Sequence, residues 1–166
     1  MILQKKTVIK KRIQNRIGSI YCVTLDDKSK VYLQYVANDW TQLNSAVLRV
    51  FKKKYSNNEE VDLEEVVRGE VWFYAHAVLN FAIRDGFWEK VGSSKELGDT
   101  TNIKFRLYSE GNINHLTVSH KWNVWTINQE KIRIGDLTNE YKHYDLGWFY
   151  SLLYLYKDKN GRISWA

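Results

Sequence analysis

The residues that could do acid–base chemistry are few, and they gather around two histidines. A metal-free ribonuclease needs two groups that exchange protons on opposite sides of a phosphate, together with a cation. His115 and His120, with Lys121 and Tyr108 nearby, are the candidates for such a set. The two histidines are five residues apart, so an unbroken strand would point them to opposite faces. RNA cleavage is therefore a third hypothesis, and it requires a bulge or turn between them.

The motifs of the commonest enzyme classes do not occur in the sequence. It contains no C-x-x-C or H-E-x-x-H zinc spacing, no P-loop, no G-x-G-x-x-G and no G-x-S-x-G elbow. His76 lies in an apolar stretch and is expected to be a hydrogen-bonded core residue rather than a base. We therefore expect no enzyme, no catalytic residue, no metal and no cofactor.

Aromatic residues suggest binding instead, through stacking or as anchors of a protein interface. The chain has 7 Trp, 11 Tyr and 6 Phe. Trp122 and Trp125 fall on opposite faces of an expected strand, so one of the two is a candidate for exposure. Trp40 lies in a polar loop between Asn38 and Gln42, where it either plugs the end of a barrel or contacts a partner.

The net charge of +6 is unevenly distributed, because residues 1–16 contain six bases and no acid. Such a segment suits an anionic partner, or a solvated edge strand whose lysines discourage pairing. A second basic run, Lys52, Lys53 and Lys54, is followed closely by acids. That pattern indicates an exposed turn before a helix rather than a nucleic-acid groove.

Arg49 interrupts an apolar strand face that it shares with Val47 and Phe51. It is either a contact for a partner or a long side chain that reaches solvent from a sheet edge.

The elements that position these residues are mainly strands. With 166 residues, 44% hydrophobic and 27% charged, the chain is typical of one globular domain spanning residues 1–166. We predict an α+β, β-rich fold in which a strongly bent antiparallel sheet, SH3-like or half-barrel, carries two or three short helices. The predicted strands are residues 17–25, 30–36, 45–51, 103–109, 115–127 and 132–134.

Helices are predicted in three places. Asp62 can cap a short helix that runs through Arg68 and stops at Gly69, since Glu65 completes a capping-box pattern. Residues 71–83 are apolar all round, and we predict a strand to about Ala75 followed by helical turns that end at Gly86. For residues 146–156 a helix capped by Asp145 is favoured over a buried strand.

The compartment follows from the cysteine count and the hydropathy. Cys22 is the only cysteine, so no intrachain disulfide can form and a reducing compartment is indicated. The N-terminus has no apolar stretch typical of a signal peptide. The longest charge-free apolar stretch, residues 71–83, is shorter than the about 20 residues of a bilayer span. We therefore expect a cytoplasmic protein with no membrane contact.

Two stretches combine glycine with aromatic residues. The first is Ile17-Gly18-Ser19-Ile20-Tyr21-Cys22-Val23, with the strand at residues 32–36 after it, and the second is residues 82–92, which include Gly86-Phe87-Trp88-Glu89-Lys90-Val91-Gly92. Gly86 permits the positive φ that ends a helical turn, and Trp88 can pack as the chain re-enters the core. Together they resemble the immunity protein 26 family of bacterial polymorphic toxin systems. Ser19 replaces an acidic residue of that pattern.

The resemblance implies an inhibitor that binds one cognate toxin through a rigid, complementary surface and needs no catalytic residues. The basic net charge suggests that the target presents an acidic face. The candidate contacts are Trp40, Arg49, Lys52, Lys53 and Lys54. The alternative is a nucleic-acid-binding small β-barrel module that uses residues 1–16 and exposed aromatic side chains, with an affinity that falls steeply with salt.

Overall fold

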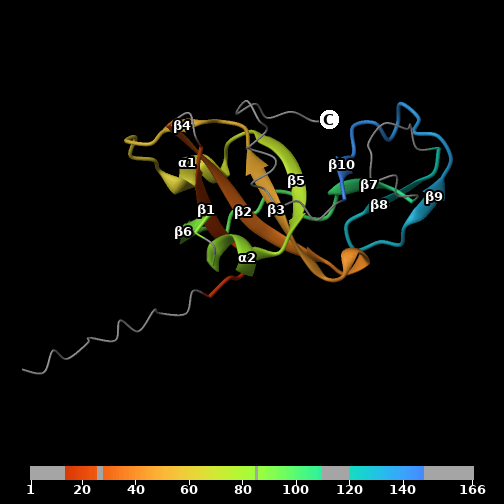
Figure 1. Ribbon diagram of the computed structural model, residues 1–166, viewed down its shortest axis with the longest axis horizontal. Helices are drawn as coiled ribbons and strands as arrows, with labels where there is room; N and C mark the ends of the chain where they lie inside the picture. Colours follow the sequence, from red (N-terminus) through yellow and green to blue (C-terminus); the bar gives the residue numbers. More distant parts are fainter. Residues whose placement is uncertain (1–13, 26–27, 85, 110–119, 148–166) are drawn as a thin grey trace, which may run out of the picture.

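The computed structural model describes residues 14–25, 28–84, 86–109 and 120–147. Within them the strands form two sheets that lie along the long axis of the molecule (Figure 1). The larger sheet has the order β5-β3-β2-β1-β6, with β4 paired to β2, and the smaller has the order β10-β7-β8-β9. The strands of the larger sheet are β1 (Ser19–Thr24), β2 (Ser29–Asp39), β3 (Ser45–Phe51), β4 (Tyr55–Ser56), β5 (Val71–Ala77) and β6 (Glu89–Ser93). Those of the smaller sheet are β7 (Lys104–Tyr108), β8 (Trp122–Thr126), β9 (Ile132–Ile134) and β10 (Asp145–Leu146).

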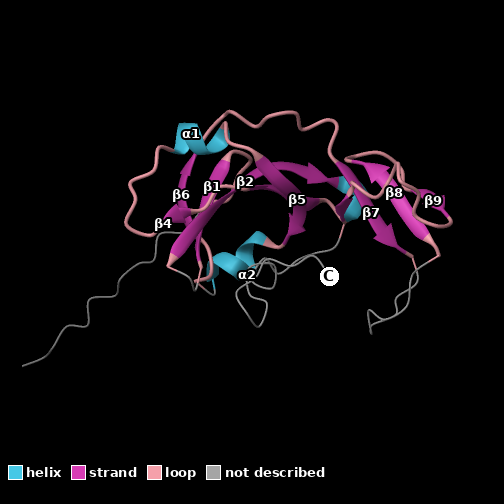
Figure 2. Ribbon diagram, turned by 90° about the horizontal axis from the view of Figure 1, so that it is seen from above, coloured by secondary structure: helices cyan, strands magenta, loops and turns pink. Residues whose placement is uncertain are grey.

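The larger sheet has apolar residues on both faces, and a helix covers each face. Helix α1 (Leu63–Val67) and helix α2 (Leu79–Arg84) lie on opposite sides of it, as Figure 2 shows. Along β2, Val31 and Leu33 pack in the core on the α2 side, whereas Tyr32 packs in the core on the α1 side. Strand β2 therefore has apolar residues on both faces, with the alternation expected of a strand.

A third core joins the two sheets. The pairing of β2 with β3 shifts register between Tyr35 and Ala37, and a bulge of this kind bends a strand. Beyond the shift, Val36 and Val47 of the larger sheet pack against Phe105 and Trp125 of the smaller one.

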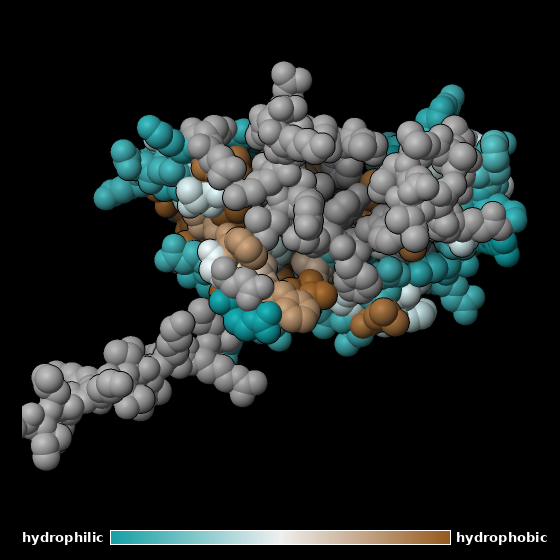
Figure 3. All heavy atoms as spheres, viewed as in Figure 1, coloured by the Kyte–Doolittle hydropathy of each residue, from teal (hydrophilic) through white to brown (hydrophobic). Residues whose placement is uncertain are grey.

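Local signals in the sequence identified the two helices correctly. The Asp62 carboxylate accepts a hydrogen bond from the backbone N–H of Glu64 at 2.9 Å and caps α1. Strand β5 continues to Ala77, two residues beyond the prediction, before α2 begins. Gly86 has a φ of +77°, and Trp88 is buried against Tyr21. Hydrophobic residues also remain on the surface over α2 (Figure 3).

The α+β, β-rich class is confirmed, but the strands are divided between two sheets that do not close into a barrel. The predicted helix cap at Asp145 is wrong, because Asp145 and Leu146 form β10, which runs parallel to β7. Residues 148–156 of that predicted helix lie outside the described part of the chain. In the described ranges no helix is long and apolar enough to cross a bilayer.

Candidate functional site

The loop between β2 and β3, Trp40–Asn44, presents two large apolar side chains to solvent. It begins with the 3-10 turn η1 (Trp40–Gln42) and ends with Leu43 and Asn44, whose φ values are 56° and 51°. Asn tolerates this left-handed conformation, whereas Leu adopts it only at a cost. Trp40 is 57% exposed and Leu43 is 85% exposed. Trp40 therefore does not plug the end of a barrel.

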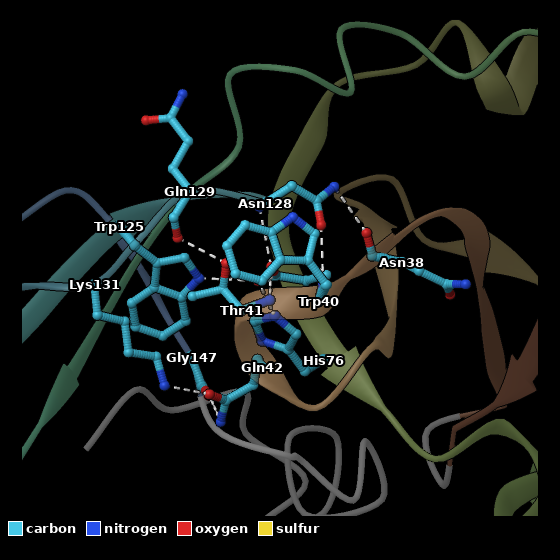
Figure 4. A network of polar contacts seen from close by, with 11 residues as sticks. Asn38, Trp40, Thr41, Gln42, His76, Trp125, Asn128, Gln129, Lys131 and Gly147 are labelled. Atoms are coloured by element: carbon cyan, nitrogen blue, oxygen red, sulfur yellow. Dashed lines mark hydrogen bonds and ion pairs between the residues drawn. The ribbon is translucent and has the colours of Figure 1, made fainter.

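A buried carboxylate immediately before the loop fixes its base. Asp39 Oδ2 accepts hydrogen bonds from the Trp125 indole N–H and from His76 Nε2, each at 2.9 Å. Asp39 Oδ1 accepts from the backbone N–H groups of Thr41, at 3.1 Å, and Asn128, at 3.0 Å. Figure 4 shows how these groups converge from both sheets.

These hydrogen bonds keep Asp39 ionised although it has no exposed surface. Burial alone would raise the pKa of Asp39, but the hydrogen bonds from His76, Trp125 and the Asn128 backbone outweigh it and lower the pKa to about 2. Because an ionised carboxylate can only accept, His76 Nε2 carries the proton in this contact. The prediction that His76 is a hydrogen-bonded core residue is confirmed.

A second layer of contacts clamps the loop to the turn after β8. The Asn128 side chain accepts from the Trp40 backbone N–H at 2.9 Å and donates to the Asn38 carbonyl at 3.0 Å. The Thr41 hydroxyl donates to the Gln129 carbonyl at 2.7 Å. The exposed loop is therefore held by hydrogen bonds on both sides of Trp40.

Gln42 extends this clamp to the end of β10. Its amide N–H donates to the Gly147 carbonyl at 3.1 Å, and its amide oxygen accepts from Lys131 Nζ at 2.6 Å. The same Lys131 ammonium lies 4.7 Å from the centre of the Trp125 ring, which adds a cation–π contact at the rim of the buried network.

Arg49 lies inside the protein, where the free structure does not expose it to a partner. Only 3% of the surface of Arg49 is exposed. Nε donates to Gln34 Oε1 at 2.8 Å, and Nη2 donates to the Glu96 carbonyl at 2.7 Å. A Cβ on Gly98 would lie 2.7 Å from Nη1, so the guanidinium fills the space beside that glycine. The alternative of a side chain that reaches solvent from a sheet edge is wrong, because β3 lies between β2 and β5.

The basic run lies away from Trp40, at the other end of β3. Lys52 forms an ion pair with Glu70 at 2.7 Å, and Lys53 Nζ lies 4.4 Å from the centre of the Tyr55 ring. Lys54 follows at the same end of the strand. The structure therefore does not bring the three lysines together with Trp40.

The ribonuclease candidates are not assembled into a site within the described residues. His120 precedes β8 instead of lying within it, and its Nδ1 lies 2.5 Å from Asp136 Oδ1 on the open surface. His115 lies outside the described part of the chain. In the ranges that are described, no group of three or more His, Cys, Asp or Glu side chains could hold a metal ion.

Of the two tryptophans of β8, Trp125 is the buried one. Trp122 is half-buried, with the Arg106 guanidinium 5.7 Å from its ring centre and the Tyr108 ring at 5.8 Å. Residues 1–13, which carry most of the basic first segment, are not among the described residues. The nucleic-acid hypothesis therefore stays a prediction.

The sequence indicates Trp40, but Asp39 and Asn128, which hold its loop, are not among the site residues predicted from it. An Asp two residues before Thr41 is a typical local capping pattern, since its side chain can accept the second following N–H. That signal was present in the sequence. Nothing local indicated Asn128, which is 88 residues from Trp40 in the chain.

A firmly anchored loop with an exposed tryptophan is the kind of surface that protein-binding proteins use. The chain belongs to the immunity protein 26 family, whose family model matches residues 16–114. That range includes Gly18, Gly86 and Trp88, on which the resemblance rested, as well as the exposed loop. Immunity proteins act against toxins and are generally not enzymes. A comparison with curated proteins and one with solved structures found no match.

Proposed function

We propose that this protein neutralises a cognate bacterial toxin by stoichiometric binding, and that the loop Trp40–Asn44 is a central contact. The observation that carries the proposal is an indole exposed to solvent on a backbone that is held by hydrogen bonds. Trp40 is followed by Leu43, which exposes 85% of its surface. Tryptophan is enriched among the residues that contribute most to protein interfaces.

The anchoring of the loop supports tight binding. Association costs free energy when loops and side chains become ordered at an interface. Here Asp39, Thr41, Gln42 and Asn128 order the loop before any partner arrives. More of the contact energy with the toxin therefore remains as affinity.

The backbone conformation and the exposure of Leu43 also support the proposal. A left-handed backbone is unfavourable for a leucine, and its exposed side chain gains little from burial in the free protein. Residues kept in such conformations often occur at ligand-binding positions. A partner that covers Leu43 would provide the apolar contact that the fold does not.

The test is co-expression with the product of the adjacent upstream gene, followed by size-exclusion chromatography at about 150 mM salt, where exposed charges are largely screened beyond about 8 Å. We expect co-elution at fixed stoichiometry and rescue of growth from the toxin. Trp40→Ala should weaken binding by about 30-fold or more without changing thermal unfolding.

Ile132→Ala is the matched control, because Ile132 is 63% exposed on β9 and lies outside the loop. It should bind the toxin as the wild type does. Separate elution of the wild-type protein and no rescue of growth would refute the neutralisation of that toxin. Equal losses in Trp40→Ala and Ile132→Ala would refute the role of the loop.

A further inference from the structure

The exposed loop borders a surface hollow that reaches helix α2. The hollow has a volume of about 480 Å³, and its lining includes Leu43 from the loop, Val78 just before α2, Leu79 and Asn80 of α2, and Asn15. Leu43 thus belongs both to the loop that carries Trp40 and to the wall of the hollow. The two features form one continuous surface.

Exposed apolar side chains lie at and beside the α2 end of this hollow. Val78, which lines the hollow, is 48% exposed, and Phe81 of α2 is 56% exposed. Hydrophobic residues gather on the surface over α2 (Figure 3). Patches of this kind on a folded protein mark contacts with other molecules. The hollow is therefore suited to an apolar side chain that projects from a partner.

Cations lie close to the chain segment, residues 14–16, that borders the hollow through Asn15. Asn15, which lines the hollow, donates from its side-chain amide to Asn80 of α2 at 3.3 Å, and the exposed Arg16 is the next residue along the chain. Lys90 Nζ donates to the carbonyl of Gln14. The pKa of Lys90 is lowered, first by burial and second by the nearby charge of Arg16, so two cations are close to each other here.

A third cation lies on α2, where the Arg84 guanidinium is 5.0 Å from the centre of the Phe81 ring. No acidic side chain is among the residues that line the hollow in the described part of the chain. On the opposite face of the sheet, by contrast, α1 carries Glu64 and Glu65 in its first turn. The α2 face is therefore the one that favours an acidic partner.

We propose that the toxin-binding surface extends from Trp40 across this hollow, and that the toxin inserts an apolar side chain there, ringed by its own carboxylates. This inference rests on the proposed function. It adds the chemistry of the partner's contact face and two new contact positions, Val78 and Arg16, neither of which belongs to the Trp40 loop.

The test uses the full-length protein and the purified product of the adjacent upstream gene, titrated by calorimetry at about 50 and about 300 mM salt, between which screening rises strongly. Val78→Asp should weaken binding by about 30-fold or more, because it places an anion opposite carboxylates. Residue 78 immediately precedes α2, where Asp is a favoured N-cap, so this variant should fold. Arg16→Glu should weaken binding by about 10-fold at low salt and less at high salt.

Two controls match these substitutions away from the hollow. Ile132→Asp puts the same charge at an exposed apolar position on β9. Lys95→Glu reverses an exposed charge next to Ser94, whose hydroxyl contacts Glu64 of α1. Both should bind within about twofold of wild type, as surface changes outside an interface do.

The outcomes separate this inference from the function on which it rests. Wild-type affinity for Val78→Asp and Arg16→Glu, with Trp40→Ala still impaired, would overturn the inference and leave the proposed function in place. Equal losses in the test and control variants would also overturn it. If the wild-type protein fails to bind the toxin, the proposed function falls and this inference falls with it.

Discussion

The indole N–H of Trp125 donates a hydrogen bond to Asp39 Oδ2 at 2.9 Å, and this single contact connects the last residue of β2 to the middle of the second sheet. Asp39 also accepts from His76 of β5. Its carboxylate thus joins three strands, two from the larger sheet and one from the smaller.

Replacing Asp39 should destabilise the protein strongly. Asp39→Ala removes the acceptor from buried donors on His76 and Trp125, and loss of one partner of such a buried network costs about 3 to 5 kcal/mol. Urea unfolding would measure this change in the free energy of unfolding. Asp136→Ala is the control, since it removes an exposed partner of His120 and should cost less than about 1 kcal/mol. A similar small cost for both variants would contradict the role of Asp39.

Acid should act on Asp39 and Asp145 in opposite directions. The pKa of Asp39 is lowered from 3.8 to about 2 in the folded protein, so its stabilising contribution is present above pH 3.8 and is lost between pH 3.8 and about 2. Burial raises the pKa of Asp145 to about 6, against a hydrogen bond from the Tyr74 backbone and the charge of Arg106. Protonation of Asp145 therefore stabilises the folded state as the pH falls from about 6 to 3.8.

Asp145→Asn isolates this second effect. Its amide oxygen can still accept from the Tyr74 N–H, which lies 2.9 Å from Asp145 Oδ2. We expect the variant to be about 2 kcal/mol more stable than wild type at pH 7 and equal to it near pH 4. Chemical unfolding across this pH range would show the difference. A constant difference between the two proteins from pH 7 to pH 4 would contradict the prediction.

Arg49 should matter for folding and not for toxin binding. Arg49→Met leaves the buried Gln34 Oε1 and the Glu96 carbonyl without their donors, at a cost of about 3 kcal/mol. The affinity of the folded fraction for the toxin should stay at the wild-type value. Lys52→Met, which breaks the exposed ion pair with Glu70, should cost less than about 1 kcal/mol. A variant that folds as stably as wild type but no longer binds would restore Arg49 as a contact.

Leu43→Asn should separate stability from binding. Asn is favoured over Leu in the left-handed conformation, so the free energy of unfolding should rise by about 0.5 to 1 kcal/mol. Toxin affinity should fall at the same time, because an exposed apolar contact is lost. Thermal unfolding and calorimetry measure the two effects. A variant that is less stable, or one that binds as wild type does, would contradict one half of the prediction.

Much of the fold could be predicted because its signals are local. Asp62 lies next to the helix that it caps, and Gly86 ends the helical turn that its own conformation permits. The alternation along β2 likewise needs only neighbouring residues. These features depend on the chain within a few positions, so the sequence alone indicates them.

The polar contacts between distant residues could not be predicted. The sequence shows Arg49 as an interruption of an apolar face, but its environment depends on Gln34 and on the Glu96 carbonyl, 15 and 47 residues away. Local sequence predicts a helix cap at Asp145, whereas the residue that it pairs with in β7, Phe105, is distant in the chain. The contact between the two sheets at Asp39 depends on a hydrogen bond from Trp125, 86 residues along the chain. No periodicity in the sequence reveals such a pair.

The position of Asp39 between β2 and the exposed loop has a consequence for how the protein opens. If a toxin contacts Trp40 as proposed, its binding favours conformations in which this carboxylate is in place, so the binding free energy also opposes separation of the two sheets. Backbone amides of β8 and β9 should then exchange more slowly with deuterated solvent in the complex. Binding of a partner at a short surface loop would in this way slow the opening of the second sheet.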